Sequence, residues 1–233
     1  MSLKIMLFSD IHWQYPNFPQ SDFPPCDIAL FAGDWSGRGT ESESRAFASW
    51  YATLPAKNKI AIPGNHERHC YAYPDLTRSI FQEHGITLLI DDFITVSGIN
   101  IYGTPWCPGF GDWSWAYLAS ETHLHEIFSK IPCDTDILMT HCPPAWSLDD
   151  GFGSTALEDV LFTRSHRPSV HVFGHVHGAH GHSLVNDTYN YNASVLDDDY
   201  NIAWKPTIIE FEKSPGGGNH EHSITDSADS DRS

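Results

Sequence analysis

The sequence has few basic residues. Its 13 Lys and Arg stand against 30 Asp and Glu, which gives a formal net charge of −17. A surface that neutralises a nucleic acid backbone needs clustered Lys and Arg, so the composition disfavours a long nucleic acid as a partner. Bound divalent cations are the exception, because they make a single site positive inside an acidic protein.

The sequence also lacks a CxxC pair and a long apolar run, and we expect no signal peptide. The apolar run near the N-terminus is too short for a signal peptide, and no run approaches the length of a membrane span. An odd number of cysteines without paired spacing favours free thiols in a reducing compartment. We therefore expect a cytoplasmic protein with no membrane partner, in which the cysteines are free: Cys26, Cys70, Cys107, Cys133 and Cys142.

The remaining composition indicates a folded chain. Of 233 residues, 40% are hydrophobic and 13% aromatic, which is typical of a globular domain rather than a disordered chain. The last twenty or so residues carry few apolar side chains. We expect one domain over residues 1–212 and a disordered tail over residues 213–233.

Five short apolar runs each end in polar residues: KIMLFSD (4–10), DIALFAGD (27–34), KIAIPGNHE (59–67), DILMTHCPP (136–144) and SVHVFGHVH (169–177). Runs of this kind are typical of strands that are buried on both faces. Helical patterns occur between several of them, over 40–55, 74–85, 114–132 and 154–164, while 86–106 alternates like a hairpin. The proline-rich segment 10–27 predicts an irregular loop, and late strands are expected in 188–194 and 206–212. The sequence thus predicts a mixed α/β domain.

The polar residues that end these runs form a coherent set of metal ligands. Residues two apart in an extended chain project to one side, which would pair Asp10 with His12 and His175 with His177. A shell of carboxylate, imidazole and amide groups suits Mn, Fe or Zn. Two metals close together need a shared carboxylate, and Asp34 is the natural candidate. The full set is Asp10, His12, Asp34, Asn65, His66, His141, His175 and His177.

Taken alone, the individual motifs that supply these residues have simpler interpretations. The tract HVFGHVHGAHGH (171–182) contains five histidines and would bind metal by composition alone if it were a metal store. A buried Asp10–His12 pair would be an ordinary structural hydrogen bond. The order of the pieces, each closing an apolar run, favours one site to which the tract contributes only His175 and His177.

The ordered set DxH, GD, GNH, H and GHxH resembles the calcineurin-like metallophosphoesterases. The resemblance runs from Asp10 to His177 and on to about Phe211. Within that family it is closest to the class III-type and MPPED-like metallophosphodiesterases, on the strings PGNHE, YGTPW and THCPP. The resemblance implies a four-layer sandwich in which two mixed β-sheets are flanked by helices.

The resemblance also implies a role for each residue. Asp10, His12 and His177 would bind a first metal, Asn65, His141 and His175 a second, and Asp34 would bridge both. His66 would face the scissile phosphate and act as general acid or stabilise the developing charge. Two divalent cations, expected to be Mn²⁺ with Fe or Zn as alternatives, would lower the pKa of a shared water. The implied reaction is attack of the resulting hydroxide on a small phosphodiester such as a cyclic nucleotide.

Two residues outside the ligand set are candidates for substrate contact. GDWSGRG (33–39) partly matches the protein phosphatases, in which an Arg at the position of Arg38 holds phosphate. Gly37, however, falls where those enzymes carry the Asp that orients the catalytic His, so the partner of His66 is not identified. Trp106 belongs to an aromatic segment that would form a substrate wall. A solvated loop for Arg38 and a core-covering role for Trp106 are the alternatives.

Other functions remain open at this stage. The same family includes phosphomonoesterases and protein phosphatases, nucleotide pyrophosphatases and nucleases. A metal-binding relative without catalysis is a further alternative, although every position of the motif set is filled, which favours an enzyme. The natural substrate and the oligomeric state do not follow from the sequence.

Overall fold

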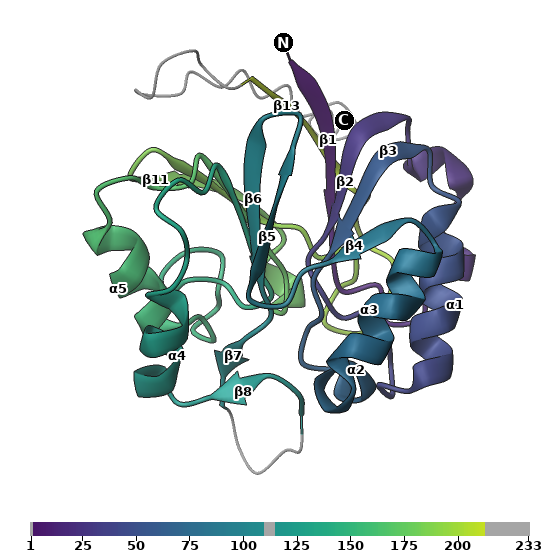
Figure 1. The fold of residues 1–233 in the computed structure, drawn as a ribbon, viewed down its shortest axis with the longest axis horizontal. Coiled ribbons are helices and arrows are strands. Elements are labelled where there is room, and N and C mark those ends of the chain that lie inside the picture. Colours follow the sequence, from purple (N-terminus) through teal and green to yellow (C-terminus); the bar gives the residue numbers. More distant parts are fainter. Residues whose placement is uncertain (1, 110–114, 213–233) are drawn as a thin grey trace.

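A computed structural model describes residues 2–109 and 115–212, and two β-sheets form its centre (Figure 1). The first sheet has the order β13-β1-β2-β3-β4. Its strands β1 to β4 are parallel, and β13 runs antiparallel to β1 at the edge. Their bounds are β1 Leu3–Phe8, β2 Cys26–Phe31, β3 Ala56–Ala61, β4 Ile86–Leu88 and β13 Thr207–Phe211.

The second sheet has the order β11-β12-β10-β9-β6-β5. Its four central strands are parallel, and the two edge strands β11 and β5 are antiparallel to their neighbours. The bounds are β5 Asp92–Val96, β6 Ile99–Thr104, β9 Ile137–Thr140, β10 Val170–Phe173, β11 Gly181–Val185 and β12 Thr188–Asn192. Short strands β7 (Cys107–Pro108) and β8 (Leu118–Ala119) pair with each other outside both sheets.

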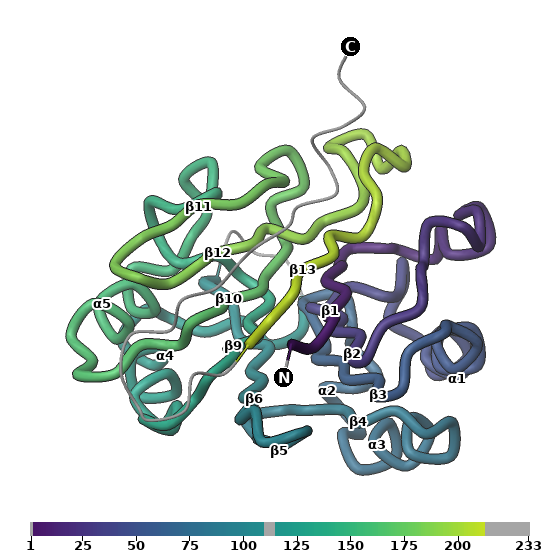
Figure 2. The backbone as a smooth tube through the Cα atoms, turned by 90° about the horizontal axis from the view of Figure 1, so that it is seen from above, coloured from purple at the N-terminus to yellow at the C-terminus, as the bar shows by residue number. Residues whose placement is uncertain are grey.

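Helices cover the outer face of each sheet. The helices α1 (Glu41–Ala52), α2 (Arg68–Ala72) and α3 (Pro74–Glu83) lie beside the first sheet, and α4 (Glu121–Phe128) and α5 (Thr155–Thr163) lie beside the second (Figure 2). Three 3₁₀ turns complete the described elements: Tyr15–Asn17, Gln20–Asp22 and His177–Ala179. The prediction of a sandwich of two mixed sheets flanked by helices is confirmed.

The alternation of side chains explains the continuous apolar runs. In β1, Ile5 and Leu7 pack between the two sheets, whereas Met6 and Phe8 pack toward the helices of the first sheet. Strands whose two faces are both buried need apolar residues at every position. Apolar side chains from α4 and α5 cover the other face of the second sheet. The strands are therefore held firmly, and the loops at their carboxyl ends have a rigid base.

Two elements differ from the sequence prediction. The helix expected from residue 114 begins only at Glu121, because the Ser120 hydroxyl caps it by accepting the backbone N–H of His123. Leu118 and Ala119 form the strand β8, which pairs with β7, instead of belonging to the helix. The segment 86–106 is not one hairpin: β4 joins the first sheet, and only β5 and β6 form a hairpin in the second.

Three further sequence predictions concern the cysteines, membrane spans and the C-terminal tail. All five cysteines are free thiols, and only Cys133 among them is exposed. Within residues 2–109 and 115–212, we find no helix with the length and apolar character needed to cross a bilayer. The predicted tail, 213–233, lies outside the described residues, as does 110–114 in the aromatic segment.

Candidate metal centre

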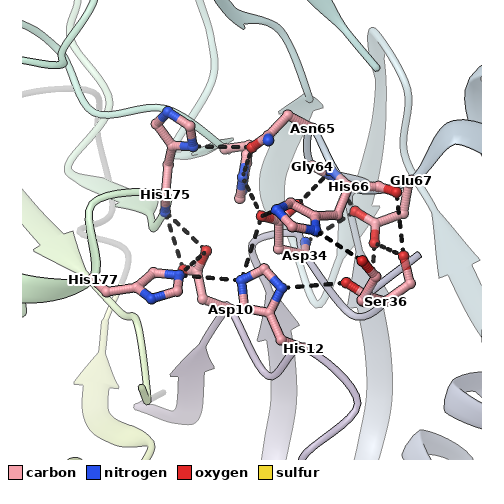
Figure 3. Close-up of polar contacts among 12 residues, drawn as sticks. Asp10, His12, Asp34, Ser36, Gly64, Asn65, His66, Glu67, His175 and His177 are labelled. Carbon is pink, nitrogen blue, oxygen red and sulfur yellow. Dashed lines mark hydrogen bonds and ion pairs between the residues drawn. The ribbon is translucent and has the colours of Figure 1, made fainter. Parts of the chain in front are cut away.

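The expected ligands meet at the carboxyl ends of the strands. The loops after β1, β2 and β3 approach those after β9 and β10, although the two groups belong to different sheets (Figure 3). Close polar contacts link all eight residues that the sequence singled out: Asp10, His12, Asp34, Asn65, His66, His141, His175 and His177. Their roles as ligands and acid remain predictions, but their proximity is a property of the fold.

The backbone at these residues is not extended. Asp10, His12, Asp34 and His175 have φ angles of 55°, 37°, 62° and 70°, in the left-handed region. We expected an extended chain to place Asp10 beside His12 and His175 beside His177. That expectation is wrong, because β1 and β10 end before these residues. Left-handed backbone at a residue with a side chain costs about 1–3 kcal/mol and concentrates at functional sites.

One half of the cluster gathers around Asp10 and His177. The His12 Nε2 lies 3.1 Å from the His177 Nε2, and the latter lies 3.6 Å from the Asp10 Oδ1. The His12 Nε2 is also 3.6 Å from the Asp34 Oδ2. Two donor atoms bound to one cation at about 2.1 Å lie about 3.0–3.5 Å apart, so this spacing suits a shared cation.

The other half gathers around Asn65. Its side-chain oxygen lies 3.0 Å from the His141 Nε2 and 3.0 Å from the His175 Nδ1. The His141 Nε2 is 3.3 Å from the same Asp34 oxygen that faces His12. Asp34 therefore lies between the two halves, where a bridging carboxylate is needed. The oxygen and nitrogen donors fit two divalent cations of the Mn, Fe or Zn type.

Backbone carbonyls orient three of the imidazoles. The Nδ1 atom of His141 lies 2.8 Å from the Ala32 carbonyl, and that of His12 lies 3.2 Å from the Ser36 carbonyl. The Nδ1 atom of His177 lies 3.1 Å from the carbonyl of Asp197. An N–H that donates to a carbonyl through Nδ1 leaves the Nε2 lone pair facing the site, as a metal ligand requires.

The charges in the cluster are strongly coupled. Burial opposes ionisation of Asp34, but the neighbouring histidines, His141 foremost, hold the pKa of Asp34 well below its usual range. Burial likewise opposes protonation of His141, yet Asp34 raises the pKa of His141 to about 10. Burial lowers the pKa of His12 and of His175 to about 4. Asp34 thus needs a positive partner, and neutral His12 and His175 are available as ligands.

His66 occupies a distinct place beside the ligand set. Its Nε2 lies 3.8 Å from the Asp34 Oδ2, and its ring packs against Trp115 with the centroids 4.2 Å apart and the planes tilted by 30°. Its Nδ1 lies 3.4 Å from the carbonyl of Gly37, the residue that replaces the orienting Asp of protein phosphatases. The partner of His66 that the sequence left unidentified is therefore a backbone carbonyl.

Glu67 is a part of the site that sequence reasoning left out. Its carboxylate is 1% exposed, and one oxygen accepts the backbone N–H groups of Asp34 and Gly64 at 3.0 and 2.6 Å. The other accepts the N–H and the hydroxyl of Ser36 at 3.0 and 2.9 Å. Burial first, and then the charge of Asp34, raise the pKa of Glu67 to about 8. Its place directly after Asn65 and His66 was the available signal.

A cavity of about 290 Å³ opens onto the cluster. Its described lining includes His66 and five of the expected ligands, and also aromatic and acidic residues that the sequence did not single out: Trp115, Phe152, Asp198 and Tyr200. Arg38 and Trp106 are not among the lining residues.

The two expected substrate contacts have other surroundings than the cavity lining. Arg38 is exposed, and its backbone N–H donates to Glu43. The Trp106 indole N–H donates to Asp91 at 2.9 Å, and its ring packs against Tyr117. The aromatic residues that line the cavity are Trp115, Phe152 and Tyr200, and substrate contact by Arg38 or Trp106 stays a prediction.

The histidine tract divides as the ordered motif suggested. His175 and His177 line the cavity. His171 is buried in the second sheet, where its Nε2 lies 2.8 Å from the Thr140 hydroxyl. His180 stacks on Trp204, and His182 lies on β11.

Cys107 is a further group near the second half of the cluster. Its sulfur and a ring nitrogen of each of His141 and His175 lie within 4.8 Å of one another. The Cys107 thiol donates to the Pro105 carbonyl at 3.6 Å, and burial raises its pKa. Because the thiol already donates to a backbone carbonyl and lies in the apolar cluster with Cys142, we assign Cys107 to the packing around the site.

The sequence and the fold of this chain are similar to those of known proteins. The sequence model described as Calcineurin-like phosphoesterase matches residues 3–179. Probable rhamnogalacturonate lyase C of Emericella nidulans is 32% identical over 199 residues, which cover 78% of this chain and 18% of that protein. Metallophosphoesterase domain-containing protein 1 of Homo sapiens is 31% identical over 214 residues, which cover 80% of this chain and 65% of that protein. The chain thus spans less than two thirds of the length of either relative.

Among solved structures, TT1561 of Thermus thermophilus aligns with a TM-score of 0.63. The alignment covers 82% of this chain and 89% of that chain at 13% sequence identity. At this level of identity the likeness concerns the fold, and it agrees with the sandwich of two mixed sheets.

Proposed function

The chain belongs to the calcineurin-like phosphoesterase family, and from that premise we propose that it is a metal-dependent phosphodiesterase acting on small phosphodiesters such as cyclic nucleotides. The observation that carries the proposal is the position of Asp34. One of its oxygens lies 3.6 Å from the His12 Nε2 and 3.3 Å from the His141 Nε2, so one carboxylate serves both halves of the cluster. Such a pair of adjoining cation sites is what hydrolysis of a phosphoric ester by two metals requires.

When bound, two divalent cations supply a nucleophilic hydroxide at neutral pH and hold the phosphate oxygens. We propose Mn²⁺ as the preferred ion, since the ligands are mostly carboxylate, amide and imidazole. Asp10, His12 and His177 would hold one ion and Asn65, His141 and His175 the other. Asp34 would bridge them.

His66 would protonate the leaving oxygen or stabilise its developing charge. It lines the cavity and approaches Asp34, while the Gly37 carbonyl at its Nδ1 directs its Nε2 toward the site. Trp115 packs against its ring and limits its rotation. An imidazole held in this way is a suitable general acid for a leaving alkoxide.

The size and charge of the cavity support a small substrate. A volume of about 290 Å³ is at the lower end of the range for small-molecule sites. None of the residues described as lining it is Lys or Arg. A polyphosphate or a long nucleic acid would meet few basic partners here.

The proposal is tested by Mn²⁺-dependent hydrolysis of bis(p-nitrophenyl) phosphate and of p-nitrophenyl phosphate. We expect turnover with metal only, a preference for the diester, and retained Mn²⁺ with a loss of turnover of about 100-fold or more in His66→Ala. His84→Ala, which replaces a histidine on the far end of α3, serves as the matched control. No metal-dependent turnover of either ester would leave a metal-binding protein without catalysis, and a strong preference for the monoester would favour a phosphatase.

A further inference from the structure

The turn formed by residues 197–201 is attached directly to the metal cluster. The Asp197 carboxylate accepts the backbone N–H groups of Asp199 at 3.0 Å and of Asn201 at 2.8 Å. The carbonyl of Asp197 lies 3.1 Å from the Nδ1 of His177. The same residue therefore shapes the turn and orients an expected ligand, so the position of the turn relative to the cluster is well defined.

The turn places two side chains at the cavity. The Tyr200 ring lies edge-on to the rings of His12 and His177, with centroids 5.0 and 5.1 Å away. The Asp198 carboxylate accepts the backbone N–H of Gly178 at 2.9 Å. This hydrogen bond holds Asp198 beside the residue that follows His177, and both Asp198 and Tyr200 line the cavity.

Asp198 differs from the other acidic residue in the described lining. Asp34 belongs to the expected ligand set, and its charge is compensated within the cluster. Asp198 is exposed, contacts a backbone N–H, and adds a negative charge to the lining of the cavity. No Lys or Arg among the described lining residues offsets that charge.

This charge discriminates between classes of phosphoric ester. A phosphodiester carries one negative charge, whereas a phosphomonoester carries between one and two near pH 7 because its second pKa is about 6. The additional charge of the monoester is repelled by a carboxylate in the cavity lining, and no Lys or Arg among the described lining residues offsets that repulsion. The repulsion raises the barrier for the monoester more than for the diester.

We propose that Asp198 is a specificity-determining residue that favours phosphodiesters over phosphomonoesters at this site. The inference rests on the proposed function, since it concerns the substrate of the same metal cluster. Asp198 acts on the substrate by its charge and takes no part in metal binding or proton transfer. Its effect is therefore expected in the ratio of two activities rather than in activity as such.

The test measures kcat/KM of the Mn²⁺-loaded protein for bis(p-nitrophenyl) phosphate and p-nitrophenyl phosphate. Asp198→Asn keeps the shape and the acceptor for the Gly178 N–H, and we expect it to lower the diester-to-monoester ratio about threefold at low salt. At about 1 M salt, where the Debye length falls to about 3 Å, that difference should shrink. Asp199→Asn removes the same charge from the same turn at a residue outside the described lining, and it should preserve the ratio.

The outcomes separate the two proposals. Turnover with a ratio unchanged by Asp198→Asn would overturn the assignment of Asp198 and leave the proposed function intact. An equal change in Asp199→Asn would also overturn it, because the effect would then be one of overall charge. Absence of metal-dependent turnover by the parent protein would overturn the proposed function and this inference together.

Discussion

At the scale of single residues, Glu67 connects two loops that carry expected metal ligands. Its carboxylate accepts backbone N–H groups from Asp34 and Gly64 on one side and from Ser36 on the other. The Ser36 carbonyl in turn lies beside the Nδ1 of His12. One buried acid thus determines the positions of groups that would bind both cations, although it would touch neither.

Replacing Glu67 by Gln should weaken metal binding. The amide offers one acceptor oxygen in place of two, and its NH₂ group would face backbone N–H donors. We expect the Mn²⁺ affinity of Glu67→Gln to fall about tenfold, measured by titration calorimetry, since partners that orient ligands typically contribute 10–100-fold. Glu83→Gln, at an exposed position on α3, is the control. Equal affinity in the two variants would contradict this role.

For His171 we predict an effect on stability rather than on activity. Burial lowers its pKa to about 3, although a hydrogen bond to Asn190 opposes the shift. The unfolded chain binds a proton near pH 6.5 and the folded chain does not, so stability is present above pH 6.5 and is lost as the pH falls toward 3. Between pH 6.5 and about pH 4.5 the loss should be about 2 kcal/mol.

The measurement for His171 is urea unfolding at both pH values. The parent protein should lose about 2 kcal/mol more of its free energy of unfolding on acidification than His171→Gln, which cannot be protonated. Comparing the pH-dependent losses removes any constant effect of the substitution on packing. The same loss in both proteins would show that another group carries the pH dependence.

At the scale of elements, the first turn of α1 shapes the loop behind His66. Glu43 forms the capping box with Thr40, and its other carboxylate oxygen accepts the N–H groups of Gly37 and Arg38, both at 3.1 Å. Gly37 then presents its carbonyl to the Nδ1 of His66. The beginning of a helix therefore orients the expected general acid, which explains why no acidic side chain is needed at position 37.

Removing this cap should separate catalysis from metal binding. In Glu43→Ala we expect kcat to fall about tenfold, because a misplaced acid loses much of its effect, while Mn²⁺ affinity is maintained. The free energy of unfolding should decrease by about 1 kcal/mol through the lost cap. Glu41→Ala, in the same turn but outside the capping box, provides the comparison. Reduced Mn²⁺ affinity with unchanged kcat would contradict the assignment.

The same elements show what could be predicted from the sequence. The runs that became β1, β2, β9, β10 and the last residues of β3 were recognisable because both faces of the chain are buried there. The polar residues after them were recognisable because parallel strands deliver their carboxyl ends to one edge. The capping box at Thr40 and Glu43 was likewise a local signal.

The features that escaped prediction depend on contacts distant in sequence. Phe152, Asp198 and Tyr200 reach the cavity through loops whose course no local pattern records. The left-handed backbone of Asp10, His12 and His175 depends on neighbouring loops rather than on strand geometry. Trp106 resembled a substrate contact, but Asp91, fifteen residues earlier in the chain, binds its indole N–H.

At the scale of the whole molecule, the candidate site depends on both sheets. Asp10, Asp34 and Asn65 follow strands of the first sheet, while His141 and His175 follow strands of the second. Each half of the cluster draws ligands from both sheets, so the apolar layer between the sheets determines the distances within each half. With a net charge of −17, the protein would attract an anionic substrate mainly through cations bound at this junction.

The most direct test is anomalous diffraction from crystals of the protein grown with Mn²⁺. We predict two peaks about 3.5–4 Å apart on either side of the Asp34 carboxylate, as in two-metal hydrolytic sites. One ion should contact Asp10, His12 and His177, and the other Asn65, His141 and His175. Peaks confined to the region of His180 and His182, or no peak beside Asp34, would contradict the central claim that these strand ends form a dinuclear metal centre.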